Sequence, residues 1–197
     1  MIQRISAKTR GLAVVATVVV VAAAAACKSL TGVPANLSTI SDTGTVYAIN
    51  GSPPGAPTAL HLLTASLLAA DPTFFFDVAF DIDTAGNPVF LPQRAVASGL
   101  SSTHGVGLQR SEADFDAIGS APKNGYRADT ALVVRVGETV LVQSTDPTAC
   151  ALSITGSSIY AKVVVTGVDT EARTLAIRYT IDPNCGFLSF GAGVPKE

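Results

Sequence analysis

Apolar and polar residues alternate along several parts of the chain, a pattern that is typical of β-strands with one buried face. One such alternation lies in residues 174–181, where every second residue is apolar: Leu175, Ile177, Tyr179 and Ile181. Residues 159–168 form a second apolar run, and the polar segment 169–173 separates the two. The two runs therefore predict an antiparallel β-hairpin.

The clearest strand is predicted over residues 74–83, which place apolar side chains on one face and three aspartates, Asp77, Asp81 and Asp83, on the solvent face. A turn at 84–87 leads to a return strand at 89–91. Proline lacks the backbone N–H that a sheet needs, so Pro88 and Pro92 predict that this partner strand lies at a sheet edge.

Other segments carry weaker signals. Residues 132–136 and 139–143 flank Gly137-Glu138, which predicts a hairpin with a type II′ turn. Residues 95–97 and 105–109 are predicted as short strands, and 112–118 as one or two helical turns after a capping-box pattern. Residues 59–70 have leucines at helical spacing but no charge, so a helix would have no solvent face. We expect a buried strand or a strand pair there rather than a helix.

These elements predict an all-β fold: an antiparallel β-sandwich of roughly eight strands with Greek-key character, in one domain that spans residues 44–197. A small closed β-barrel is the alternative, because the same alternation suits both architectures.

The first 26 residues have the order of a secretory signal peptide. Arg4, Lys8 and Arg10 precede sixteen apolar residues, 11–26, which end in an alanine run before Cys27. Sixteen residues rise about 24 Å as a helix, less than the ~30 Å hydrocarbon core of a bilayer, so a permanent span is the weaker interpretation.

The run Ala24-Ala25-Ala26-Cys27 resembles the lipobox of bacterial lipoproteins. In that family a peptidase cuts before the cysteine, which carries a diacylglyceryl group and then receives a further acyl chain such as palmitate. Lipoproteins prefer Leu where this chain has Ala24. Ordinary cleavage to a soluble secreted protein and a retained membrane anchor therefore stay open. The resemblance implies a lipidated Cys27 and, because Lys28 is not Asp, the outer membrane in a cell that has two. Residues 28–43 contain Gly, Pro, Asn and Ser with little periodicity, which predicts that 27–43 is the lipidated cysteine and a flexible tether, with an irregular first strand as the alternative.

The three cysteines can be assigned together. If Cys27 is lipidated, Cys150 and Cys185 remain as a pair. Each follows an Asp-Pro turn, and the predicted order of strands places both at one end of the sheet. We therefore predict a Cys150–Cys185 disulfide.

Charge narrows the range of partners. Charged residues make up only 14% of the chain, no basic cluster follows residue 10, and the remainder has an acidic excess. This balance argues against a nucleic-acid partner. Beyond the membrane itself, a protein or glycan of the cell envelope is the partner class that stays open, and no motif for a cofactor is present.

The sequence offers weak candidates for metal binding. His61 and His104 are far apart in sequence and lack zinc-ligand spacing, so His61 is expected to be packed and His104 solvent-exposed. The weak calcium candidates are Asp81, Asp83 and Asn87. Ala85 stands where an EF-hand has its third ligand and Pro92 where it has its glutamate, so we expect no metal site.

Catalytic motifs are also missing from the sequence, which favours a non-enzymatic domain. The one conceivable triad combines His104 with Ser101, Ser102 or Asp114. The sequence thus predicts a membrane-anchored extracytoplasmic lipoprotein whose β domain has a structural or binding role. A barrel that carries an apolar ligand and a secreted hydrolase with a dispersed triad are the alternatives.

Overall fold

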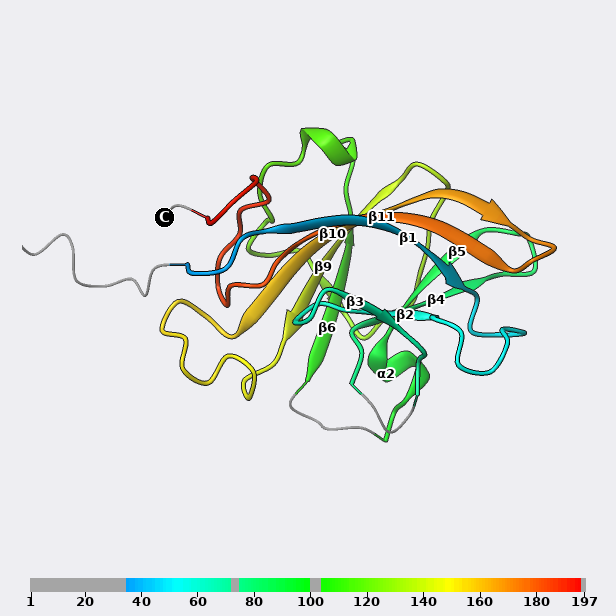
Figure 1. Cartoon of the computed structure of the whole chain (residues 1–197), viewed down its shortest axis with the longest axis horizontal. Helices are drawn as coiled ribbons and strands as arrows, with labels where there is room; N and C mark the ends of the chain where they lie inside the picture. The colour runs from blue at the N-terminus through cyan, green and yellow to red at the C-terminus, as the bar shows by residue number, and fades with distance from the viewer. Residues whose placement is uncertain (1–34, 72–74, 100–103, 196–197) are drawn as a thin grey trace, which may run out of the picture. The chain divides into compact units, whose positions relative to one another are not determined.

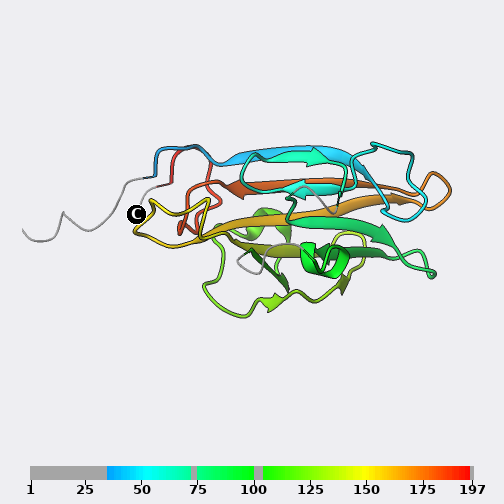
Figure 2. The same ribbon diagram turned by 90° about the horizontal axis from the view of Figure 1, so that it is seen from below.

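The computed structural model describes residues 35–71, 75–99 and 104–195, which form two antiparallel β-sheets packed face to face (Figures 1 and 2). In sheet order, the six-stranded sheet contains β1 (Ile40–Tyr47), β11 (Thr174–Asp182), β10 (Ser158–Asp169), β9 (Thr139–Thr145), β6 (Gly105–Arg110) and β7 (Arg127–Ala128). The five-stranded sheet contains β3 (Ser66–Leu68), β2 (Ala59–His61), β4 (Val78–Ile82), β5 (Pro88–Pro92) and β8 (Leu132–Val133). Each sheet ends in two edge strands, so the predicted β-sandwich is confirmed and the closed-barrel alternative is excluded.

Apolar side chains of both sheets fill the space between them. Phe80 and Phe90 of the five-stranded sheet contact each other edge to face, with ring centroids 5.1 Å apart. Ile177 and Ile181 of β11 belong to the same buried cluster. The predicted alternation in β11 is therefore confirmed, and it directs these side chains into the core.

The longest strands form the predicted hairpin. β10 and β11 pair from Tyr160↔Asp182 to Asp169↔Thr174, with an irregularity between Val165 and Gly167. The connecting turn is closed by Asp169, whose side chain accepts hydrogen bonds from the backbone N–H groups of Glu171 and Ala172. An Asp at this position favours such a turn because its carboxylate replaces a backbone acceptor.

Residues 59–70 form the strand pair expected from their lack of charge. β2 and β3 pair from Ala59↔Leu68 to His61↔Ser66, and β2 also pairs with β4. Ala59 and Leu60 are fully buried, which explains why this segment carries no polar face.

Several sequence predictions are wrong in detail, beginning with two in the region of β5. Strand β5 is not an edge strand, because β4 lies on one side and β8 on the other. β8 pairs only with Val89 and Phe90 in the middle of β5. Pro88 and Pro92, at the ends of β5, therefore do not have to donate a backbone hydrogen bond to β8. Residues 95–97 contribute to a short helix, α2 (Gln93–Val96), rather than to a strand.

The expected hairpin around Gly137 is absent, because β8 and β9 belong to different sheets. Glu138 donates its N–H to the Arg135 carbonyl in a tight turn, and the Gly137 N–H bonds to the Val165 carbonyl. The turn thus carries the chain from one sheet to the other, a distinction that local alternation does not encode.

The folded domain also begins earlier than residue 44. β1 starts at Ile40 and pairs with β11 along its whole length. The helical turns expected over 112–118 are reduced to one 3-10 turn, η1 (Phe115–Ala117). Among the described residues, no helix is long and apolar enough to cross a membrane.

A second apolar cluster covers the outer face of the six-stranded sheet: Ile118, Ala121, Leu141, Tyr160 and Phe190. Lys162 of β10 is buried beneath it, and its Nζ donates to the carbonyls of Phe115 and Ile118 at 2.7 and 2.8 Å. Burial lowers the pKa of this amine. These two charge-assisted hydrogen bonds hold the loop around η1 against the six-stranded sheet.

Candidate functional site

Cys150 and Cys185 form the expected disulfide, with their Cα atoms 5.7 Å apart. Cys150 lies in the loop after β9, and Cys185 lies just beyond β11. Because β9 and β11 run in the same direction on either side of β10, their ends meet at one end of the sheet. Cys27, the predicted lipidation site, lies outside the described residues.

The first described residues are hydrogen-bonded to Asn184, the residue that precedes Cys185 of the disulfide. The side chain of Asn184 accepts hydrogen bonds from the backbone N–H groups of Asn36 and Leu37, both at 3.1 Å, and donates to the Leu37 carbonyl at 2.8 Å. The Thr39 N–H bonds to the Gly193 carbonyl at 2.9 Å. The chain therefore enters the domain beside Cys185.

We call this region the tether end and define it as residues 35–41, 147–157 and 183–195. Figures 1 and 2 both show its three segments, drawn in blue, yellow and red, at the same end of the sandwich.

Asp182, which is fully buried, accepts hydrogen bonds from the backbone and side-chain nitrogens of Asn184 at 3.0 and 2.7 Å. Burial raises the pKa of Asp182, and these two donors oppose the rise.

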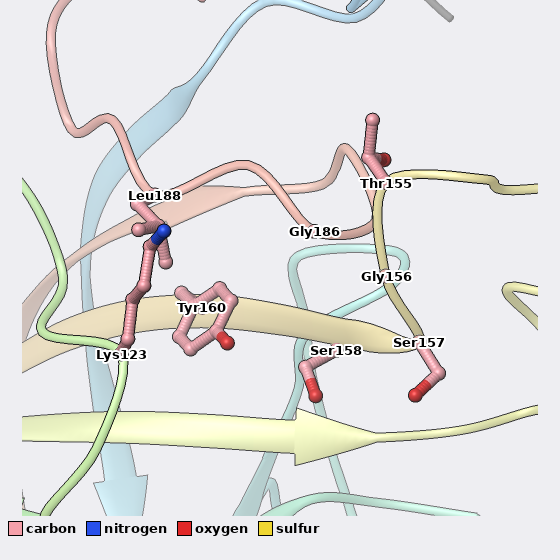
Figure 3. A pocket seen from close by; sticks show the side chains of 8 residues that line it. All are labelled: Lys123, Thr155, Gly156, Ser157, Ser158, Tyr160, Gly186 and Leu188. Carbon is pink, nitrogen blue, oxygen red and sulfur yellow. The ribbon is translucent and has the colours of Figure 1, made fainter. Parts of the chain in front are cut away.

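A small polar pocket of about 240 Å³ opens at the tether end (Figure 3). Tyr160 on β10 lies between Lys123 on one side and Ser158 on the other. Gly186 forms part of the wall with φ +83°, and a Cβ there would lie 2.5 Å from the carbonyl carbon of Thr155. Only glycine fits this contact, so the wall of the pocket is set by the backbone.

A buried polar cluster lies beside the tether end and contains Asp77, His104, Ser144 and Asp146. The register explains its assembly. Gly105 of β6 pairs with Thr145 of β9, so the residues just beyond them, His104 and Asp146, lie next to each other. Asp77 precedes β4 of the opposite sheet and accepts hydrogen bonds from Ser144 Oγ at 2.5 Å and the Leu62 N–H at 2.6 Å.

His104 is placed between the two carboxylates. Its Nε2 lies 3.2 Å from Asp77 Oδ1, and its Nδ1 lies 3.8 Å from Asp146 Oδ2. Neither contact has the alignment of a full hydrogen bond. Burial alone lowers the pKa of the ring, but the two carboxylates raise it by more, and the net effect is a raised pKa. The cluster therefore favours a protonated His104.

The cluster does not have the arrangement of a hydrolytic triad. The Ser144 hydroxyl donates its hydrogen bond to Asp77 rather than to His104, and both Ser144 and His104 are buried. Asp114, expected as a partner of His104, is instead exposed just before η1. Ser101 and Ser102 lie outside the described residues. The described groups form a buried polar cluster and not a serine activated by a histidine base.

Sequence reasoning placed these residues wrongly. Asp77 was expected on a solvent face and His104 in solvent, yet they are 1% and 4% exposed. The alternation from residue 74 assumed a strand that in fact begins at Val78, so Asp77 lies in a bend where the period of two no longer applies. The second histidine, His61, makes a local contact, with its Nδ1 2.8 Å from Thr64 Oγ1.

The weak calcium candidates lie at the other end of the sandwich, where each carboxylate has donors of its own. Asp81 pairs with Arg173 at 2.9 Å. Asp83 accepts from the backbone N–H groups of Ala85 and Asn87, both at 2.8 Å. The donors of Asn87 lower the pKa of Asp83. Within the described ranges, no three His, Cys, Asp or Glu side chains are grouped to hold a metal ion.

Comparison with known proteins gave no match to a family model, to a curated protein or to a solved structure. The function proposed below rests on the residues of this chain.

Proposed function

We propose that this chain is an exported lipoprotein, held at a membrane by acyl groups on Cys27, and that its β-sandwich has a structural or binding role outside the cytoplasm. A protein or glycan of the cell envelope is the partner class that fits this location. In a cell with two membranes, Lys28 favours the outer one by the resemblance to lipoproteins.

The observation that carries this proposal is the assignment of the cysteines. The disulfide uses Cys150 and Cys185, which leaves Cys27 as the one cysteine available for a lipid. Stable disulfides are typical of oxidising compartments outside the cytoplasm. Cys27 directly follows the alanine run at the end of a basic and then apolar leader, where lipoproteins carry their modified cysteine.

Mass spectrometry of the protein from its native membrane fraction tests the proposal. We expect a chain that begins at Cys27, is heavier by its acyl groups and contains one disulfide. Cys27→Ala should abolish the added mass and release the protein from the membrane or leave its leader uncleaved. Lys28→Asp provides a matched variant, which should keep the acyl groups and change only the membrane in which the protein is found. An unmodified mature chain in the soluble fraction would contradict the proposal.

A further inference from the structure

The tether end is formed by three segments that carry no charge. None of the residues in 35–41, 147–157 and 183–195 is Asp, Glu, Lys, Arg or His. These segments are far apart in sequence and meet only in the folded domain, through Asn184 and the disulfide. A protein surface in water normally carries charged residues of both signs, so three neighbouring surface segments without them are unusual.

Large apolar side chains are exposed at this same end. Leu152 is 95% exposed and Ile154 is 68% exposed, the two highest values among the large apolar residues that the structure describes. Leu37 and Val194 are about half exposed in the neighbouring segments. Contiguous exposed apolar groups mark contact surfaces for proteins or membranes.

The loop that carries Leu152 and Ile154 is held in place from inside. Its polar residues alternate with the apolar ones, and the hydroxyls of Ser153 and Thr155 both donate to the carbonyl of Cys185, at 3.1 and 2.5 Å. Cys150 fixes the start of the loop through the disulfide. The polar side chains thus bond inward, which leaves Leu152 and Ile154 in solvent.

The position of the predicted lipid identifies what covers this surface. Only seven residues lie between Cys27 and Ala35, where the described chain begins, so the two are eight positions apart. Such a segment spans at most about 28 Å when fully extended. An acylated Cys27 therefore keeps the tether end within reach of the bilayer, which raises the effective concentration of lipid around Leu152 and Ile154.

We propose that the loop 150–156 inserts Leu152 and Ile154 into the interface of the bilayer that holds the acylated Cys27; this inference rests on the lipid anchor proposed above. The insertion removes apolar surface from water, and the inserted loop 150–156 itself carries no charge that would have to lose its hydration. The anchor and the loop together then fix the sandwich with its tether end toward the lipid.

Because the chain contains no tryptophan, one introduced tryptophan reports its own surroundings. The experiment uses the full lipidated protein carrying Leu152→Trp, reconstituted into phosphatidylethanolamine–phosphatidylglycerol vesicles with and without brominated acyl chains. Val136→Trp is the matched control, because Val136 is half exposed and precedes β9, whereas the loop follows it. We expect blue-shifted emission and strong quenching by brominated lipid for Leu152→Trp, and neither effect for Val136→Trp.

The alternative outcomes separate the possible failures. A protein that floats with the vesicles but shows a red, unquenched Leu152→Trp signal overturns the insertion while the anchor stands. A blue-shifted signal without lipid quenching indicates a second copy of the chain as the occupant and also overturns it. A chain without acyl groups, recognised by its mass before reconstitution, overturns both proposals.

Removal of the apolar groups provides an independent measurement. In the lipidated protein, Leu152→Ser combined with Ile154→Ser should speed transfer between vesicles about tenfold or more, since each apolar side chain then contributes less to membrane binding. Val136→Ser should transfer at the wild-type rate. Equal rates for all three proteins contradict the insertion.

Discussion

The two ends of the sandwich are closed by different interactions. At the tether end, the disulfide and the neutral hydrogen bonds of Asn184 join segments without charge. At the opposite end, the loops 50–57, 83–87 and 169–173 meet around Arg173. This arginine pairs with Asp81 at 2.9 Å and donates to the Asn50 carbonyl at 2.5 Å.

The difference shows that one fold can present two environments. An end that is held by ion pairs depends on water and salt, because charges are stabilised by hydration and screened by ions. An end that is held by a covalent bond and by buried hydrogen bonds depends less on salt, because no exposed ion pair has to be kept. The proposed insertion of Leu152 and Ile154 places the less salt-dependent end toward the lipid.

Loss of the disulfide should have the largest effect on this contrast. Cys150→Ser combined with Cys185→Ser opens a loop that spans 35 positions, and we expect about 3–4 kcal/mol less stability from chain entropy. Thermal and denaturant unfolding measure the loss, and reduction of the wild-type protein should reproduce it. An unchanged melting temperature after full reduction would count against a stabilising role for the bridge.

Asn184→Ala should have the next largest effect. It removes a buried side chain that makes three bonds to residues 36–37 and also supplies a donor to the buried Asp182. We expect a loss of about 2 kcal/mol, together with faster hydrogen exchange in residues 36–39. Asn50→Ala, at the opposite end, is the matched control and should cost less, because the bond of its side chain to Asp81 is exposed. Equal exchange in both variants would refute the role of Asn184 in holding the first residues.

Arg173→Ala sharpens the contrast from the opposite end. The variant loses the pair with Asp81 and the bond to Asn50, and we expect a loss of about 1 kcal/mol that shrinks in high salt. Arg135→Ala is the matched control. It should have little effect on stability, because the Arg135 side chain is largely exposed. Denaturant unfolding at low and high salt measures both. The same salt dependence in the wild type and in Arg173→Ala would show that this end does not rely on the ion pair.

The smallest effect concerns pH and the cluster beside the tether end. The pKa of His104 is raised in the folded state, so its contribution to stability is complete below the unfolded value near 6.5 and is lost as pH rises through the folded pKa. The wild type should therefore lose stability across that window relative to His104→Gln. His61→Gln is the matched control for loss of an imidazole. Identical pH profiles for the two variants in denaturant unfolding would contradict this role of His104.

Much of the fold could be predicted from local patterns. The β10–β11 hairpin follows from alternation and a polar turn, and the disulfide follows from the direction of the strands on either side of β10. These features depend on neighbours in sequence or on a single strand reversal. The assignment of β8 and β9 to different sheets could not be predicted, because it depends on where the whole chain crosses the core.

The buried cluster could not be predicted for a related reason. Asp77 and Ser144 come from opposite sheets and are 67 residues apart in sequence, so only sheet-on-sheet packing brings them together. The apolar residues Leu152 and Ile154 carry no periodic signal in the sequence. Their exposure is visible only once the disulfide and the hydroxyls of Ser153 and Thr155 are placed.

The pairing of β1 has a mechanical consequence. β1 is an edge strand that follows the tether directly, and its eight residue pairs with β11 run antiparallel. A pull on the N-terminal side along the strand axis, resisted at the opposite end of the sandwich, would load all eight pairs in shear at the same time. Resistance at Cys185, which lies beside the N-terminal end of β1, would instead open the pairs one after another from Ile40↔Ile181. The pairing of β1 with β11 therefore resists a force between the two ends of the sandwich better than a force between two points at the tether end.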